Sequence, residues 1–285
     1  MEQMNASTWQ EAATIAKSNP DIVQGTWPSP GQHLQMRVDK TPFTDIKVRT
    51  ALQMAVDLPT IAKTHYGGLV PGVGCGLIYP GFTGYTLPFD QWDANLQKEF
   101  TYNVAGAKQL LTDAGYPNGF KTDIVAAATG EDIELLQIVK SEFMDIGVDM
   151  TINMFADLPA KQAYMQAMKH DQMAYANSVG VAQAPNMAIT RIMPGAQGNG
   201  TANDDAKYVD LIKQAQSAKT EADAKKLCTE VDIYGLQQHW CVNITPTVSP
   251  IFWQPWVKEN SGEMIIGGLA RFYYTRWWID SSLKK

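Results

Sequence analysis

The stretch that decides the fold runs from Asn103 to Met154 and reads NVAGAKQLLTDAGYPNGFKTDIVAAATGEDIELLQIVKSEFMDIGVDMTINM. Asn103 is a capping residue before apolar residues at three- and four-residue spacing, and Gly115 ends the helix that this pattern predicts. A strand over 121–128 then leads into a second helix, which Gly147 stops. The following residues alternate between apolar and polar, as in a half-buried strand. This order predicts a β-α-β unit with a right-handed crossover, and therefore an α/β fold.

The same reading extends outward in both directions. Before this unit, the pattern predicts strands over 21–27 and 33–38, a helix that starts at Asp45, and a short helix after Asp57. After it come a helix over 159–169, a strand over 172–178, a Gly/Asn-rich loop to Asn203, and two further helices. Thr220 caps the last of these helices.

An uncharged, Gly- and Pro-rich segment over 67–88 separates the early helices from the β-α-β unit. It carries Tyr79, Phe82 and Tyr85, which are large apolar side chains for a solvated loop. Loops of this length are usually functional or disordered. We therefore expect the segment to lie against a surface or to line a cleft.

The overall composition excludes several classes of protein. The chain has 285 residues, of which 45% are hydrophobic and 18% charged, and this argues against disorder and disulfide scaffolds. The net charge is −6 and the basic residues are scattered, so nucleic acid is not an expected partner. The uncharged stretches over 66–89 and 240–257 contain too many Gly, Pro or polar residues for lipid-exposed helices. The first residues lack a basic and an apolar region, so no signal peptide is expected in this chain.

The cysteines and histidines do not predict a disulfide, a metal site or a cofactor. Cys228 and Cys241 are separated by a helix to about residue 238, which moves the chain by about 15 Å at ~1.5 Å per residue. We expect both, and Cys75, to be free and buried. The four histidines are spread along the chain without metal-ligand spacing; they are His33, His65, His170 and His239.

Two motifs resemble a known family. Residues 42–57 read PFTDIKVRTALQMAVD, which is similar to P-F-x-D-x-[KR]-V-R-x-A-L-x-x-A-[IV]-D. Residues 102–120 read YNVAGAKQLLTDAGYPNGF, which is similar to Y-N-x-x-x-A-K-x-L-L-x-x-A-G-Y-x-x-G-F. Both patterns are typical of family 5 extracellular solute-binding proteins, the oligopeptide-, dipeptide- and nickel-binding receptors of ABC importers. The resemblance covers about residues 20–258.

The resemblance implies a periplasmic-binding-protein-like (type II) α/β lobe. Because the first motif lies in the middle of these longer receptors, the chain looks like the C-terminal fragment of a two-lobed protein. Residues 1–39 would then be the end of the first lobe and a crossing strand, 40–245 the second ligand-binding lobe, and 246–285 a return segment of the first lobe. The implied partners are a small solute and an ABC permease. The implied location of the full-length parent is periplasmic or extracellular, soluble or lipid-anchored.

Candidate ligand-binding residues follow from where the predicted strands end. Tyr175, Asn177 and Ser178 end the strand over 172–178, and open α/β sheets bind ligands beyond the carboxyl ends of their strands; the alternative is a simple turn. Tyr79 in the long loop and Trp253 near the C-terminus could offer aromatic faces to a ligand, and the alternative for both is packing.

The strand over 172–178 also bears on the class of solute. In peptide-binding members this strand runs into an aspartate and an Asp-Pro pair, and a carboxylate there holds the ammonium group of the ligand. Here the corresponding residues are Ser178-Val179-Gly180, followed by Ala184-Pro185. The resemblance therefore implies a neutral or anionic solute rather than a peptide α-amine.

Two other readings remain open. Aromatic residues crowd the C-terminus, and Trp277 and Trp278 are expected to pack the base of a first lobe or an oligomer interface, so a homodimer is a hypothesis. The rival function is a serine-dependent carboxylic ester hydrolase built on a solute-binding lobe, with Ser178, His170 and Asp171 as candidate catalytic residues. The chain has no Gly-x-Ser-x-Gly elbow, which weakens this alternative, and no Walker A motif, which excludes the importer's ATPase.

Overall fold

A computed structural model describes residues 3–5, 9–29, 32–128, 132–177, 185–196, 198–244, 247–259 and 277–284. In chain order the elements are β1 (Gln3–Asn5), α1 (Trp9–Ser18), β2 (Val23–Ser29), β3 (Gln32–Met36), α2 (Ile46–Met54), α3 (Leu58–Thr64), η1 (Phe89–Gln91), α4 (Ala94–Glu99), α5 (Val104–Asp113), β4 (Phe120–Ala127), α6 (Ile133–Asp145), β5 (Val148–Phe155), α7 (Leu158–Gln166), β6 (Met173–Asn177), α8 (Pro185–Ala188), η2 (Ile189–Ile192), α9 (Ala206–Gln216), α10 (Glu221–Gln238), β7 (Cys241–Asn243), β8 (Thr247–Trp253), β9 (Val257–Lys258) and β10 (Trp278–Ile279).

A five-stranded sheet with the order β5-β4-β6-β3-β7 organises the larger part of the molecule. β4 pairs in parallel with β5 and with β6, whereas β3 pairs antiparallel with both of its neighbours. Since β3 alone is reversed, the chain direction of β7 matches that of β4, β5 and β6. This confirms the predicted α/β class, with one antiparallel strand in a mostly parallel sheet.

The local signals of the β-α-β unit have the predicted consequences. The Asn103 side chain accepts a hydrogen bond from the Gly106 backbone N–H at 2.9 Å and caps α5. Gly115 and Gly147 have φ values of +90° and +82° at the ends of α5 and α6. β4 and β5 pair in parallel on either side of α6, so the predicted unit is confirmed.

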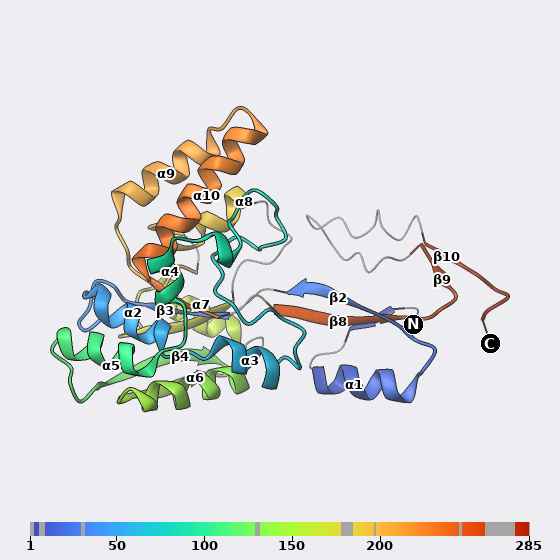
Figure 1. The fold of residues 1–285 in the computed structure, drawn as a ribbon, viewed down its shortest axis with the longest axis horizontal. Coiled ribbons are helices and arrows are strands. Elements are labelled where there is room, and N and C mark those ends of the chain that lie inside the picture. Colours follow the sequence, from blue (N-terminus) through green and yellow to red (C-terminus); the bar gives the residue numbers. More distant parts are fainter. Residues whose placement is uncertain are drawn as a thin grey trace.

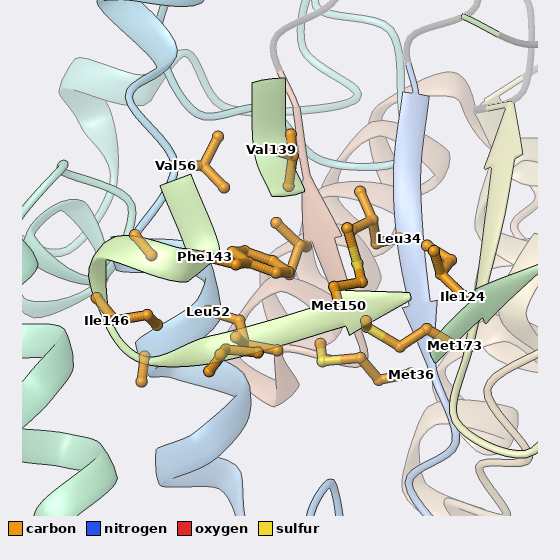
Figure 2. Packing of buried hydrophobic residues seen from close by; sticks show 14 of the residues in the cluster. Leu34, Met36, Leu52, Val56, Ile124, Val139, Phe143, Ile146, Met150 and Met173 are labelled. Atoms are coloured by element: carbon orange, nitrogen blue, oxygen red, sulfur yellow. The ribbon is translucent and has the colours of Figure 1, made fainter. Parts of the chain in front are cut away.

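One face of the sheet carries the main hydrophobic core, under α2, α5 and α6. Phe143 of α6 is fully buried and lies with Leu52, Val56 and Met150 in this core (Figure 2). Leu34 and Met36 of β3 point to the same face, as expected for alternate residues of one strand.

The opposite face is covered by α7, by the segment around Gly200, and by a second cluster built from α8, η2, α9 and α10. Tyr208 of α9 is fully buried in that cluster, and its hydroxyl donates a hydrogen bond to the Ile189 carbonyl at 2.7 Å. This face is covered only in part, because Thr151 and Asn153 of the outer strand β5 stay exposed.

Two polar residues of the first family motif hold the lobe together. Gln53 of α2 donates to the Asn243 carbonyl at 3.1 Å and accepts from the Asn243 backbone N–H at 2.7 Å. Arg49 donates from Nε and Nη2 to the Gln238 carbonyl and from Nη1 to the Phe43 carbonyl. Both side chains are buried, so this part of the motif ties α2 to β7 and to the end of α10.

A second sheet, with the order β1-β8-β2, extends away from this lobe together with α1 (Figure 1). Phe252 of β8 is fully buried against Ala12 of α1. β9 and β10 form a separate two-stranded pair near the C-terminus. The described ends of the chain lie on this side of the molecule, away from the five-stranded sheet.

The thiols behave as predicted. Cys75, Cys228 and Cys241 are free and buried, and α10 continues to Gln238 between the last two. None of the described helices is both long and apolar enough to cross a membrane.

Candidate functional site

The sheet has one end at which several strand termini meet, and we name it the carboxyl end. β4, β5, β6 and β7 finish there, at Ala127, Phe155, Asn177 and Asn243. The register places Gln32, the first residue of the reversed β3, opposite Asn177, and His33 opposite Asn243. Ligands of open α/β sheets bind beyond such an end.

Both connections to the second sheet leave from the carboxyl end. Residues 30–31 join β2 to β3, and residues 244–246 join β7 to β8. The two strands on the other side are paired as well, with Ser29 opposite Thr247. The carboxyl end therefore faces the second sheet across two adjacent chain crossings (Figure 1).

Tyr175 of β6 lies in the main core rather than on a surface. Its side chain is 0% exposed, and its hydroxyl donates to the Asp132 carbonyl at 2.9 Å. Asp132 caps α6 by accepting from the Leu135 N–H, and its carboxylate also contacts His65 Nε2 at 2.7 Å. Tyr175 thus helps to fix the start of α6 at the carboxyl end, and ligand contact by its ring stays a prediction.

Of Asn177 and Ser178, the structure describes only the backbone of Asn177. The backbone of Asn177 is paired with Gln32 at the last position of β6, which is the predicted location. Ser178 lies outside the described residues. Ligand contact by either side chain stays a prediction.

The long loop that carries Tyr79 is anchored by a buried carboxylate. Asp232 of α10 accepts hydrogen bonds from the Leu77 and Ile78 N–H groups at 3.0 and 3.4 Å, and from the Thr86 hydroxyl at 2.6 Å. Tyr79 itself is half-buried, with its ring edge-on to Phe82. The loop is thus packed on the lobe, as predicted, and whether Tyr79 meets a ligand stays a prediction.

The same loop reaches the carboxyl end at a second point. Cys75 donates from Sγ to the Ile244 carbonyl at 3.0 Å, immediately after β7. This contact places part of the loop beside one of the two chain crossings.

Trp253 ends β8 in the second sheet and is buried in a small cluster with Ile251 and Val257. Gly25 of β2 lies under its ring, where a Cβ atom would stand 3.0 Å away from Cζ3. Trp253 therefore packs within the second sheet, and its contact with a ligand stays a prediction.

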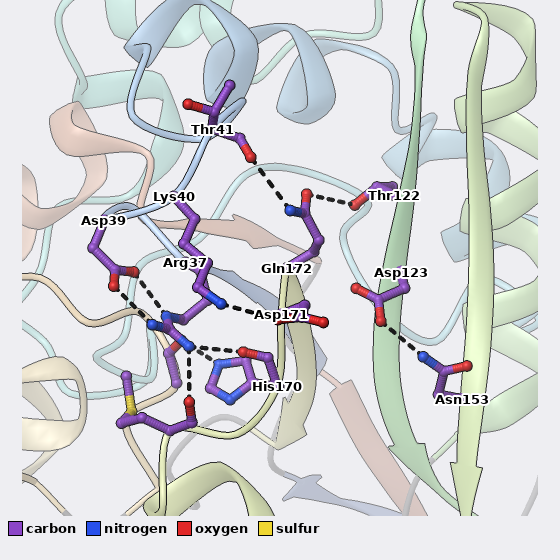
Figure 3. A network of polar contacts seen from close by, with 12 residues as sticks. Arg37, Asp39, Lys40, Thr41, Thr122, Asp123, Asn153, His170, Asp171 and Gln172 are labelled. Atoms are coloured by element: carbon purple, nitrogen blue, oxygen red, sulfur yellow. Dashed lines mark hydrogen bonds and ion pairs between the residues drawn. The ribbon is translucent and has the colours of Figure 1, made fainter.

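His170 and Asp171 point to different partners (Figure 3). His170 is buried, with Nε2 2.7 Å from the Gly200 carbonyl, whereas the Asp171 side chain is 77% exposed and pairs with Lys40 at 3.0 Å. A catalytic histidine needs a carboxylate that orients its ring. These two residues do not supply that pair, which argues against the hydrolase alternative.

Arg191 of η2 is a residue that the sequence reading missed. It is the only charged residue between Asp171 and Asp204, and this isolation was an available signal. Burial, with smaller contributions from the charges of Arg191 and Lys161, lowers the pKa of His33 to about 3. Lys161 is itself buried and donates from Nζ to the Tyr175 carbonyl.

Metal binding finds no support in the arrangement of the histidines. His65 and His239 contact Asp132 and Glu99 at 2.7 and 2.9 Å. Among the residues that the structure describes, no three His, Cys, Asp or Glu side chains gather into a possible metal site.

Solved structures of binding proteins share this fold. The chain matches the periplasmic binding protein DppA from Helicobacter pylori in complex with the peptide STSA, with a TM-score of 0.78 and 19% identity, over 98% of this chain and 53% of that one. It matches NikA from Brucella suis in complex with Fe(III)-EDTA with a TM-score of 0.76 and 14% identity, over 98% and 58%. At these identities the likeness supports the fold alone.

Two relatives of known function are similar in sequence to shorter segments of this chain. Heme-binding protein A of Haemophilus influenzae is 32% identical over 122 residues, which are 41% of this chain and 20% of that protein. The glutathione-binding protein GsiB of Escherichia coli K12 is 29% identical over 141 residues, which are 48% and 25%. The matched segment is thus about a fifth to a quarter of each relative's length.

The decisive comparison is with a family profile. The profile described as bacterial extracellular solute-binding proteins, family 5 (middle) matches residues 2–199, which include both sequence motifs. The match covers more than half of the chain, and the fold agrees with that of type II periplasmic binding proteins. The chain therefore belongs to the bacterial extracellular solute-binding proteins of family 5.

Proposed function

We propose that the chain forms the second lobe of a two-lobed receptor, which binds a small solute and delivers it to an ABC permease. The observation that carries this proposal is the position of the carboxyl end, which faces the second sheet across both chain crossings. A solute held there would be enclosed when the lobes close about these crossings.

The division of the chain follows from the same proposal. Residues 1–39 supply the end of the first lobe and a crossing strand, 40–245 the second lobe, and 246–285 the return segment. β3 (Gln32–Met36) then lies within the segment 1–39 and is also a strand of the five-stranded sheet of the second lobe. The rest of the first lobe would come from chain outside this sequence.

The solute is proposed to be a small molecule without a requirement for a free α-amine. The relatives are named for heme, glutathione and peptide binding, so family membership alone leaves the solute open. Residues 178–184 contain no acidic side chain that could hold an ammonium group. Tyr79, Tyr175, Asn177, Ser178 and Trp253 remain proposed contacts. The full-length receptor is proposed to be periplasmic or extracellular, soluble or lipid-anchored.

Saturation-transfer NMR on the purified chain tests binding of weak ligands. Reduced glutathione, the dipeptide Met-Leu and hemin serve as probes, because weak binding still transfers saturation. We expect at least one probe to receive saturation from the protein and to be displaced by excess of itself. A complete lack of transfer from all three at about 10 mM glutathione or dipeptide and soluble hemin would contradict the proposal.

The hydrolase alternative has its own assay. We expect no turnover of p-nitrophenyl acetate above the rate of a heat-denatured sample. Turnover that disappears in Ser178→Ala would instead favour the hydrolase.

A further inference from the structure

A cleft of about 650 Å³ lies among the helices beside the five-stranded sheet. Its walls come from α2, α4 and α5 and from the end of α10, and no strand residue lines it. α2 and α5 lie on the side of the sheet remote from β2 and β8 (Figure 1). The cleft is therefore separate from the carboxyl end, and its volume is within the range of small-molecule sites.

Two antiparallel helices, α2 and α5, form one wall of the cleft. The Asn103 N–H donates to the Met54 carbonyl at 2.8 Å, which places the end of α2 beside the start of α5. At the other end, Lys47 donates from Nζ to the Asp113 carbonyl at 3.4 Å. The apolar side chains of this wall are Ile46, Met54 and Leu110. They give the cleft an apolar surface on which a hydrocarbon chain can be buried.

The charged side chains of the cleft leave a positive balance. Lys47 and Lys98 both line it and are exposed, and no described residue forms an ion pair with either. Glu99 is the only acidic residue among the described residues of the lining. Its Oε2 lies 2.9 Å from Nε2 of the buried His239, whose ring stacks on Phe100 at 5.2 Å. The carboxylate thus has a partner within the fold, whereas the two lysines have no anionic partner.

The geometry points to a binding site for a medium-chain carboxylate in this cleft. Burial of the hydrocarbon chain against the apolar wall supplies most of the affinity. The charges of Lys47 and Lys98 attract the carboxylate and select against cations, in a chain whose net charge is −6. The limited volume of the cleft favours a chain of medium length. This site is independent of the proposed function, because no residue of the carboxyl end takes part in it.

Methionine methyl NMR during titration with octanoate reads the cleft directly, because Met54 lines it. We expect the Met54 methyl signal, assigned by its absence in Met54→Leu, to shift saturably. Met144 and Met154 lie outside the cleft with side chains 53% and 47% exposed, and their signals should stay in place. Shifts of all three signals over the same concentrations would indicate adsorption to any apolar surface and would overturn the proposal.

Related probes separate the hydrocarbon part of the ligand from its charge. Hexanoate has two methylenes fewer than octanoate and should bind about tenfold more weakly. Octanamide has the same length without the charge and should bind several-fold more weakly, and octylammonium should bind most weakly. Equal affinities for octanoate and octanamide would overturn the assignment of an anion. Equal affinities for octanoate and hexanoate would overturn the burial of the chain.

Lysine variants test the source of the charge preference. Lys47→Gln and Lys98→Gln should each weaken octanoate binding roughly two- to fivefold, as for other exposed charge pairs. The double variant should bind octanoate and octanamide alike. Lys213→Gln removes an exposed lysine of α9 outside the cleft and should leave the affinity unchanged. An unchanged affinity for octanoate in the double variant would contradict the proposal.

The same titration distinguishes this site from the solute site. If octanoate shifts the backbone amides of Asn177 and Asn243 and leaves the Met54 methyl in place, it binds at the carboxyl end. The inference about the cleft then fails while the proposed function stands. Saturable shifts at Met54 without shifts at the carboxyl end support the cleft and leave the test of the proposed function to its own probes.

Discussion

At the scale of the single residue, Asp232 combines an anchoring role with an unfavourable charge. Its carboxylate accepts three hydrogen bonds from the long loop, and these favour the charged form. Burial acts in the opposite direction and dominates, which raises the pKa of Asp232 to about 6. Gly76 reflects the closeness of this contact, because a Cβ atom there would overlap the carboxylate oxygens.

The pH dependence of stability should reveal this carboxyl group. A pKa raised by folding means that the folded state favours the protonated form, so stability falls as the pH rises from about 4 through 6. The loss amounts to roughly 3 kcal/mol at about 1.4 kcal/mol per pKa unit. Asp232→Asn keeps the acceptor for Leu77 and removes the charge. Urea unfolding should therefore show Asp232→Asn gaining about 2–3 kcal/mol relative to the unmodified chain between pH 4 and pH 7.

The matched variant is Asp232→Ala, which leaves the loop N–H groups without an acceptor. It should lose about 2–4 kcal/mol at pH 5. A difference between the unmodified chain and Asp232→Asn that does not change with pH would contradict the assignment.

Residue-scale prediction from the sequence succeeded where a side chain acts on its own neighbours and failed where it acts across the fold. The cap at Asn103 is a contact over three residues and could be read directly. The hydrogen bonds of Arg49 to Gln238 and of Asp232 to Leu77 span more than a hundred residues. That the buried Nε of Arg191 has no hydrogen-bond partner among the described residues is likewise visible only in the fold.

At the scale of the element, the turns before β4 and β5 fix where these strands start. Gly119 and Gly147 both have positive φ values, and their backbones pack directly on each other. A Cβ atom on Gly119 would lie only 1.9 Å from the Gly147 carbonyl oxygen. Only glycine allows this approach, so the two turns set the parallel register of the strands.

A pair of alanine variants tests this role of the turn. Gly119→Ala adds both a left-handed backbone strain and a backbone clash, and we expect a loss of about 3 kcal/mol or more. Gly115→Ala has a similar φ but nothing within 4 Å of its Cβ position, and should lose only about 1 kcal/mol. Chemical denaturation measures both. Equal losses would show that the contact with Gly147 contributes nothing.

Helices and strands could be predicted from local patterns, but their arrangement in the sheet could not. The alternating pattern over 148–154 predicted β5 and its half-buried face. No local pattern showed that β3 inserts between β6 and β7, because the pairing of His33 with Ala176 and Asn243 depends on residues far along the chain. The resemblance to the family supplied the architecture that periodicity could not.

At the scale of the whole molecule, the proposed function makes this chain one of the two lobes that enclose the solute. Closure of two lobes buries a solute from both sides, and one lobe alone provides only part of the desolvation. We expect calorimetry on the isolated chain to give millimolar or undetectable affinity. A nanomolar affinity would contradict the assignment of the chain as one lobe of a larger receptor.

The two-stranded pair of β9 and β10 raises the question of self-association. The side chain of Trp278 is 51% exposed and its neighbour Ile279 46% exposed, and apolar surface of this kind favours contact with a partner. A homodimer through the surface that would face the first lobe therefore stays a hypothesis. Light scattering decides this, and a monomeric mass at micromolar protein would count against a dimer.

The central claim is that this lobe binds its solute at the carboxyl end of the five-stranded sheet. Backbone amide NMR during titration with reduced glutathione or Met-Leu tests the claim directly. We predict that the probe that binds will shift amides of Gln32, His33, Asn177 and Asn243. Shifts confined to the pocket of about 530 Å³ around Met168, Pro194 and Ala202, at the opposite end of β6, would contradict it.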